Sequence, residues 1–296
     1  MNDAQARRWG ATAGFGVLAA QVSINVGAAL GKGLFSQVGP EGVAALRTSI
    51  AAIVLLAIAR PWAARLDRGQ VAWLVLYGLA LGGMNLLIYW AIERIPIGIA
   101  VTIEVSGPLV VVLLGSRSAR DLLWLALAAT GVLLLVPWPG AGAALDAQGV
   151  LYAAGAAFCW ALYILFGKRA SQVESTKAVA LGMVVACLVT VPSGLSAAGS
   201  ELFSVHVLSL GLVVALLSSA LPYLLEMKAL ERLTSRVFGL VTSSAPAIAA
   251  LVGFIMLGER LAIAQWVAVA LMVAASAGAS ISARSSQRPS QDAAAT

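Results

Sequence analysis

The chain has 296 residues, of which 60% are hydrophobic and 11% charged, and it carries a net charge of +6. A soluble domain usually carries about 25% charged residues, so a soluble protein of this length would not cover its surface with so few. This composition excludes an ordinary soluble protein and indicates an integral membrane protein, in which the basic charges orient the chain rather than bind nucleic acid.

Ten apolar segments follow one another along the chain, and short polar turns separate several of them. Each has a length close to the roughly 17 to 25 residues that a transmembrane helix needs. In chain order the segments are 11–31, 41–59, 71–93, 96–116, 120–137, 148–167, 177–195, 207–230, 234–257 and 261–282. We therefore expect an all-α integral membrane protein with ten transmembrane helices, followed by a polar, disordered cytoplasmic tail at 284–296.

Basic residues are distributed unevenly between alternate connections of these segments. Fourteen of them fall on one side of the predicted membrane, three on the other, and two, Arg47 and Lys228, within predicted spans. Loops on the cytoplasmic side of a membrane carry the excess of Lys and Arg. We therefore expect both termini in the cytoplasm, and the uneven distribution also supports an even number of helices.

The sequence repeats itself at an offset of 138 residues. The stretch AIERIPIGIAVTIEVSGP (91–108) aligns with ALERLTSRVFGLVTSSAP (229–246), which matches the Glu-Arg turn and pairs Pro108 with Pro246. Each repeat holds five predicted helices, so the second copy enters the membrane from the opposite side. Such inverted duplication is typical of secondary transporters. We predict one five-helix repeat over 1–145 and another over 146–283; two duplicated scaffolds without a transport role are the alternative.

Three charged residues fall deep within predicted spans: Arg47, Glu104 and Glu226. At about 1.5 Å per residue, Arg47 and Glu104 lie at similar depths, roughly 10 Å below the outer boundary of the membrane. Ionisable residues in this position usually line a pathway and have a charged partner. We therefore expect an Arg47–Glu104 pair, which either takes part in transport or only joins two helices.

Other polar and aromatic residues are expected beside these charges. Asn25 and Asn85 fall at a depth comparable to that of Arg47, and Tyr89 lies one turn from Asn85 on the same helix face. Tyr223 shares a helix face with Glu226 in a layer nearer the cytoplasm. Trp160 is expected either to line a cavity or to pack in the core.

Three prolines within the predicted spans are expected to kink their helices. They are Pro108, Pro222 and Pro246. A proline cannot donate a hydrogen bond to the carbonyl four residues earlier. The carbonyls concerned are those of Glu104, Ser218 and Thr242. In a membrane these carbonyls need another partner, which protein, water or substrate can supply.

Four stretches of the chain resemble the EamA-type permeases of the drug/metabolite transporter superfamily, and within it the bacterial threonine/homoserine exporters. They begin GAALGKGLFSQ (27–37), YGLALGGMNLL (77–87), FCWALYILFGK (158–168) and LSSALPYLLEM (217–227). The resemblance implies an inner-membrane exporter of small neutral amino acids, driven by proton antiport. It singles out Arg47, Asn85, Glu104, Tyr223 and Glu226. We expect the amino acid, protons and the lipid bilayer as partners, no cofactor, metal or nucleic acid, and a monomer or weak homodimer.

A transport mechanism follows from the chemistry of the substrate class. A zwitterionic amino acid needs an anion for its ammonium group and a donor for its carboxylate, which Glu104 and Arg47 would supply. A glutamate influenced by both apolar surroundings and an arginine could exchange a proton for the substrate ammonium, and Glu226 is the competing candidate.

Other functions remain to be compared with this one. An exporter of drugs or other metabolites and a passive channel are both open as alternatives. An enzyme is disfavoured, because the sequence contains neither an HExxH motif nor a nucleophile elbow and has one histidine.

Overall fold

The computed structural model of this chain describes residues 3–63, 66–114, 119–135, 145–170, 175–222, 225 and 242–282. Within these ranges the regular elements are all helices, and no strand is found there. The predicted all-α class is therefore confirmed for the part of the chain that the structure describes.

The first part of the chain builds a series of α-helices and one short 3-10 turn. They are α1 (Asp3–Gly33), α2 (Phe35–Ala59), η1 (Pro61–Ala63), α3 (Arg68–Arg94), α4 (Ile97–Glu104), α5 (Ser106–Leu114) and α6 (Ala119–Leu135). The second part adds further α-helices, a 3-10 turn η2 and a π turn η3. They are α7 (Ala147–Ala170), α8 (Ser175–Ala198), η2 (Gly199–Phe203), α9 (Val205–Ala215), η3 (Leu216–Ala220), α12 (Ala245–Leu257) and α13 (Ile263–Ser282).

Five described helices are long and apolar enough to cross a membrane. They are Phe15–Gly33, Phe35–Ala59, Arg68–Arg94, Ala147–Gly167 and Thr176–Phe203. Five shorter apolar helices accompany them: Ile97–Val111, Leu122–Leu134, Val205–Ala220, Ala245–Leu257 and Ile263–Gly278. Each overlaps a different one of the ten apolar segments identified in the sequence.

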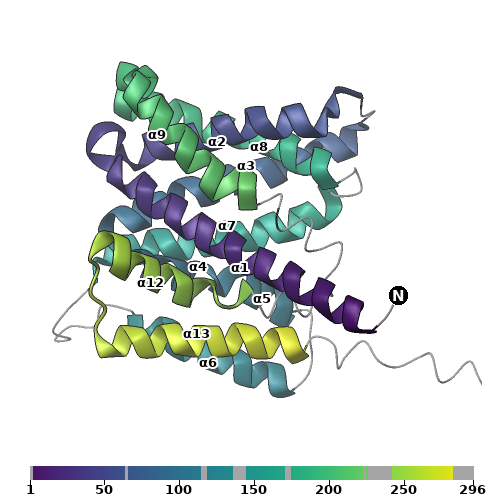
Figure 1. Ribbon diagram of the computed structural model, residues 1–296, viewed down its shortest axis with the longest axis vertical. Coiled ribbons are helices and arrows are strands. Elements are labelled where there is room, and N and C mark those ends of the chain that lie inside the picture. The colour runs from purple at the N-terminus through teal and green to yellow at the C-terminus, as the bar shows by residue number, and fades with distance from the viewer. Residues whose placement is uncertain are drawn as a thin grey trace, which may run out of the picture.

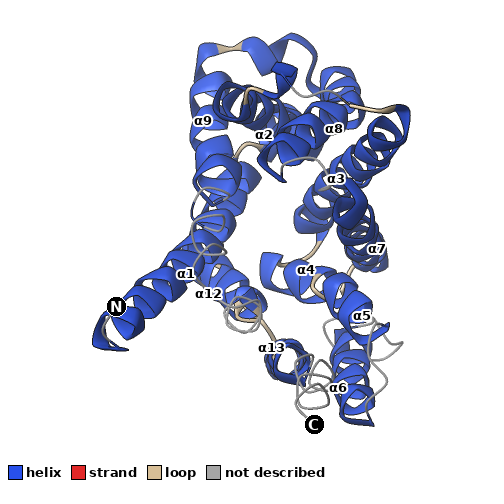
Figure 2. Ribbon diagram, turned by 90° about the vertical axis from the view of Figure 1, so that its right-hand side faces the viewer, coloured by secondary structure: helices blue, strands red, loops and turns tan. Residues whose placement is uncertain are grey.

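The helices lie side by side in a bundle (Figure 1). The most extensive contacts join α2 to α8, α3 to α7, α6 to α13 and α3 to α8. Figure 2 shows α1 and α12 on one side of the bundle, α3 and α7 on the other, and α6 paired with α13 at one end. Small residues allow this close approach: a Cβ on Gly82 would lie 3.0 Å from the Cα of Ala186.

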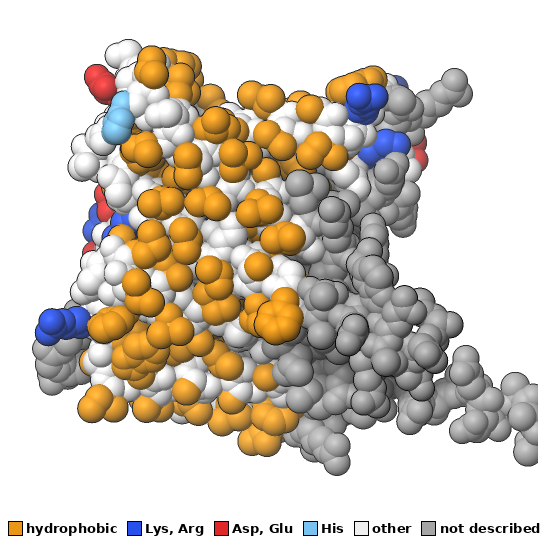
Figure 3. All heavy atoms as spheres, viewed as in Figure 1, with side chains coloured by type: hydrophobic (Ala, Val, Ile, Leu, Met, Phe, Trp, Pro, Cys, Tyr) orange, Lys and Arg blue, Asp and Glu red, His pale blue; other side chains and the backbone are white. Residues whose placement is uncertain are grey.

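The surface has the character that a lipid environment requires. Phe15, Ile255 and Ile263 are 71%, 75% and 84% exposed, and many other large hydrophobic side chains are open as well. In Figure 3 hydrophobic side chains cover the middle of the visible face, and the charged side chains lie towards its edges. An extensive exposed apolar surface of this kind marks a membrane-facing region.

Helix interruptions occur near two of the expected prolines. Val105 lies in a turn between α4 and α5, three residues before Pro108. Pro246 lies in the first turn of α12, after a turn at residues 243–244, and not in the middle of a described helix. A proline at a helix start removes no helical hydrogen bond. Ser243 is 138 residues after Val105, so both turns fall at the same position of the sequence repeat.

Candidate functional site

The guanidinium group of Arg47 contacts two other elements of the bundle. Arg47 lies on α2 and is half-buried. Its Nε donates to the Ser219 hydroxyl at 3.0 Å, and its Nη2 donates to the Ser218 carbonyl at 3.0 Å. Its guanidinium carbon lies 5.8 Å from the ring centroid of Tyr89, within the range of a cation–π contact. The side chain therefore joins α2 to the π turn η3 and to α3.

Glu104 lies at the end of α4 with 8% of its surface exposed. Among the described residues the ion pairs within 4.0 Å are Lys32–Glu259 and Arg94–Asp146. Arg47 and Glu104 form no such pair, so the prediction of a direct ion pair between them is wrong. The reason is helix packing, because α2 contacts α8 and α9 most closely, whereas α4 contacts α12 and α7. Arg47 and Glu104 therefore do not neutralise each other by direct contact.

Asn25 and Asn85 are both buried, with 3% of their surface exposed. The Asn25 Nδ2 donates to the Gln21 carbonyl at 2.9 Å, and the Asn85 Nδ2 donates to the Leu81 carbonyl at 2.8 Å. Each amide thus bonds to its own helix, α1 or α3. Within the described ranges their side-chain oxygens accept no hydrogen bond, so both retain acceptor capacity.

Tyr89 follows Asn85 by one turn on α3 and is completely buried. Its ring packs edge-on against Phe35 with 5.9 Å between the centroids. Its hydroxyl has no hydrogen-bond partner among the residues that the structure describes. A buried hydroxyl without a partner costs free energy, about 1–3 kcal/mol. Tyr89 is therefore a polar group whose partner is missing in this state.

Trp160, the other expected site residue that the structure describes, lies apart from this group. Trp160 on α7 packs against a hydrophobic cluster. The cluster includes Val105 in the turn before α5, Leu109 of α5 and Met272 of α13, so Trp160 packs in the core. Tyr223 and Glu226 lie outside the described residues.

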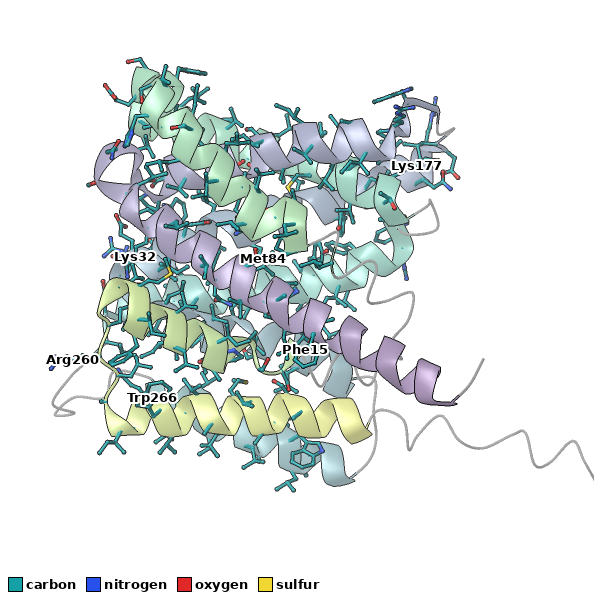
Figure 4. All side chains as sticks on the ribbon, viewed as in Figure 1. Phe15, Lys32, Met84, Lys177, Arg260 and Trp266 are labelled. Atoms are coloured by element: carbon teal, nitrogen blue, oxygen red, sulfur yellow. The ribbon has the colours of Figure 1, made fainter. Side chains whose placement is uncertain are left out.

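Two charged residues near helix ends form a partly buried ion pair. Lys32 Nζ lies 2.8 Å from Glu259 Oε1, with 25% and 12% of their side chains exposed. The second oxygen of Glu259 accepts the backbone N–H of Ile97 at 2.9 Å. Glu259 thus joins the end of α1 and the start of α4 to the turn after α12. Figure 4 shows Lys32 and Arg260 at one end of the molecule and Lys177 at the opposite end.

Sequence reasoning found Arg47 and Glu104 but missed Ser219 and the Lys32–Glu259 contact. A signal existed for part of the π turn, because Pro222 leaves the Ser218 carbonyl without its usual helical donor. No comparable signal marks Glu259, whose partners are 227 and 162 residues away in the chain. In the described part of the chain no group of three or more His, Cys, Asp or Glu side chains could hold a metal ion.

Comparison with known proteins finds one family model and several similar exporters. Residues 147–281 match the model of the EamA-like transporter family. The threonine/homoserine exporters RhtA of Escherichia coli K12 and Salmonella typhimurium LT2 are each 44% identical over 268 residues, which cover 90% of this chain and 91% of the relative.

A solved crystal structure of another protein superimposes on the chain with a TM-score of 0.58 and 22% identity. The match covers 95% of this chain and 99% of the other, so the two share a fold. Together with the apolar helices and the buried charges, the identity to the two exporters assigns the chain to its family: it belongs to the EamA-like transporter family, together with the RhtA exporters.

Proposed function

We propose that this protein is an inner-membrane secondary transporter that exports small neutral amino acids, threonine and homoserine among them, in exchange for protons. The observation that carries the proposal is the 44% identity over 90% of the chain with relatives named as threonine/homoserine exporters. Five helices of 18 residues or more are long and apolar enough to cross a membrane, and the protein surface is rich in exposed apolar side chains. Both features support a membrane location.

The separated charges of Arg47 and Glu104 support a zwitterionic substrate. Arg47 keeps N–H groups that no described residue uses, and a carboxylate is their natural partner. Glu104 accepts no hydrogen bond from the described residues and can take an ammonium group or a proton. A substrate that carries both charges would fit between the two groups, and Asn25, Asn85 and Tyr89 would add hydrogen bonds. We also propose Tyr223 and Glu226 as part of the site on sequence grounds.

Ten transmembrane helices in two inverted repeats, 1–145 and 146–283, are the proposed architecture. The pattern of helix contacts supports it. The proposed repeat makes α1 equivalent to α7, α2 to α8, α3 to α9–η3, α4–α5 to α12, and α6 to α13. If each helix is replaced by its equivalent, the contact of α3 with α7 becomes that of η3 with α1. The contact of α3 with α8 becomes that of α9 with α2, and that of α4 with α7 becomes that of α12 with α1. All of these contacts occur.

Alternating access follows from this architecture, because the two repeats can exchange conformations around a central site. The turns at Val105 and Ser243 occupy equivalent positions and offer points where helices could bend. With the charge distribution of the loops, both termini would lie in the cytoplasm.

Export from intact cells tests the proposal. Cells that overproduce the protein are loaded with labelled threonine or homoserine, and efflux is compared with cells carrying an empty vector. We expect faster efflux of both amino acids, and little efflux with Glu104→Gln. The exposed Glu93→Gln serves as the matched control and should behave as wild type. Equal efflux with and without the wild-type protein would contradict the substrate assignment.

A further inference from the structure

Two residues after the π turn η3 (Leu216–Ala220) ends, a proline interrupts the helical hydrogen bonds. The Leu221 N–H donates to the Leu216 carbonyl, five residues earlier, as a π turn requires. The next residue, Pro222, has no N–H. A continuing helix would use that N–H for the Leu217 carbonyl in a π turn or for the Ser218 carbonyl in an α turn. Pro222 therefore serves neither carbonyl.

Two other helices supply the missing donors. The Ser23 hydroxyl of α1 donates to the Leu217 carbonyl at 2.6 Å, and Arg47 Nη2 of α2 donates to the Ser218 carbonyl at 3.0 Å. Buried carbonyls in a membrane must be paired, and these two contacts pair both carbonyls that the missing Pro222 N–H could have served. The π turn is thereby attached to both α1 and α2.

The surroundings of the turn hold it in place. Ser218 and Ser219 are only 2% and 1% exposed. Gly27 of α1 lies so close that a Cβ there would be 2.8 Å from the Ser218 backbone nitrogen. Such a contact leaves no room for the turn to shift towards α1. The turn is therefore a rigid support rather than a loose helix end.

This support uses one side of the Arg47 guanidinium group and leaves another side open. Ser219 and Ser218 take the edge that carries Nε and Nη2, and the Tyr89 ring lies 5.8 Å from the guanidinium carbon. No described residue accepts a hydrogen bond from Nη1. The planar group has five N–H donors, and the edge formed by Nη1 and Nη2 matches a carboxylate with two parallel hydrogen bonds.

We infer that Ser219 is a positioning residue, which acts with the Ser218 carbonyl freed by Pro222 to hold Arg47 so that its Nη1–Nη2 edge meets the substrate carboxylate. This inference rests on the proposed amino-acid transport. It adds a consequence for specificity, because a guanidinium fixed on one edge favours ligands that carry a carboxylate over amines that lack one.

The inference is tested by threonine uptake into inverted membrane vesicles that contain the full-length protein. Ser219→Ala removes the hydroxyl that accepts from Arg47 Nε and should raise KM for threonine at least about fivefold, because a hydrogen bond to a charged group is lost. Vmax should change less than about twofold. Ser219→Thr keeps a hydroxyl and should restore a low KM. Ser209→Ala is the matched control, because that exposed hydroxyl bonds only to His206 of its own helix.

A second measurement separates positioning from a general structural effect. Unlabelled threoninol, which lacks the carboxylate, is used to compete with labelled threonine. Wild type should prefer threonine strongly, and Ser219→Ala should lose most of this preference. Pro222→Ala keeps both serines but adds an N–H that competes for the Ser218 carbonyl, so it should change KM and preference in the same direction.

Wild-type KM and wild-type preference in both Ser219→Ala and Pro222→Ala would overturn the positioning role while leaving threonine transport intact. If wild-type vesicles take up no more threonine than empty-vector vesicles, the proposed function itself is wrong, and the inference falls with it.

Discussion

At the scale of single residues, the site combines a hydrogen-bonded guanidinium group, that of Arg47, with an unpaired hydroxyl, that of Tyr89. Arg47 has two hydrogen bonds to the π turn, whereas the Tyr89 hydroxyl is buried without a partner in the described residues. An unpaired buried hydroxyl is destabilising. This cost is offset when another state of the protein or a bound substrate supplies the hydrogen-bond partner. Such a role agrees with a place for Tyr89 in the proposed site.

Tyr89→Phe should therefore separate stability from transport. Removing the unpaired hydroxyl should leave the melting temperature in detergent unchanged or raise it by a few degrees, since about 1–3 kcal/mol of desolvation cost disappears. KM for threonine should rise, because the substrate loses a hydrogen bond. Tyr152→Phe is the control, since its exposed hydroxyl accepts from Gln148 Nε2 at 2.9 Å. A lower melting temperature with unchanged KM would contradict this account of Tyr89.

A depth in the membrane can be counted from the sequence and stays a prediction, whereas residue partners could not be predicted. Depth depends on counting along one helix at about 1.5 Å per residue. That count places Arg47 and Glu104 within the membrane-spanning part of their helices. Partners depend on how distant helices rotate against each other, which apolar segments do not specify. The Arg47 side chain consequently bonds to Ser219, 172 residues away, and not to Glu104 as expected.

At the scale of elements, Glu259 joins three helices through its carboxylate and its backbone N–H. Glu259 pairs with Lys32 at the end of α1 and accepts the Ile97 N–H at the start of α4, while its own N–H donates to the Gly253 carbonyl at 3.1 Å. A carboxylate at a helix start satisfies an N–H that has no partner within the helix. The same group thus stabilises α4 and links elements from both halves of the chain.

Replacing Glu259 should destabilise the protein more than breaking an exposed ion pair. Glu259→Ala should lower the free energy of unfolding by about 1–3 kcal/mol, because it leaves the Ile97 N–H and Lys32 without a partner. A double-mutant cycle with Lys32→Ala, followed by unfolding in mixed micelles, should give a coupling of about 1 kcal/mol.

The Arg94–Asp146 pair offers the matched cycle. Its distance is 3.1 Å, but its side chains are 36% and 39% exposed, so its coupling should be smaller. A larger coupling for this pair than for Lys32–Glu259 would contradict the account.

The Gln148 backbone N–H, and after it Arg94, hold the pKa of Asp146 below its usual range. A carboxyl with a lowered pKa contributes stability above its unfolded pKa and loses it as the pH falls through the folded pKa.

Element positions were largely predictable, because apolar segments bounded by polar turns mark helices well. The prolines were less informative about shape. Pro108 lies three residues after the turn that separates α4 from α5, as a kink near it suggests, but Pro246 begins α12. The π turn before Pro222 was not predicted, and neither were the bonds that its carbonyls accept from Ser23 and Arg47 of distant helices.

At the scale of the whole molecule, charged residues lie at two opposite ends of an apolar bundle. Lys32 and Arg260 lie at one end and Lys177 at the other (Figure 4). The proposed orientation puts the first end outside the cell and the second in the cytoplasm, in agreement with the loop charges.

Cysteine labelling tests this orientation in intact cells, starting from a variant in which Cys159 and Cys187 are replaced by alanine. A membrane-impermeant maleimide should label Arg260→Cys without permeabilisation, whereas Lys177→Cys should react only after permeabilisation. The reverse pattern would show that the predicted orientation is wrong.

The most direct test of the account is whether threonine moves protons. The purified protein is reconstituted into liposomes with a pH-sensitive dye in the lumen, and threonine is added outside at equal pH on both sides. Antiport predicts that the lumen becomes more alkaline as threonine enters, that Glu104→Gln abolishes the signal, and that Glu93→Gln retains it. Threonine entry through the wild-type protein without any change in luminal pH would contradict the exchange of amino acid for protons.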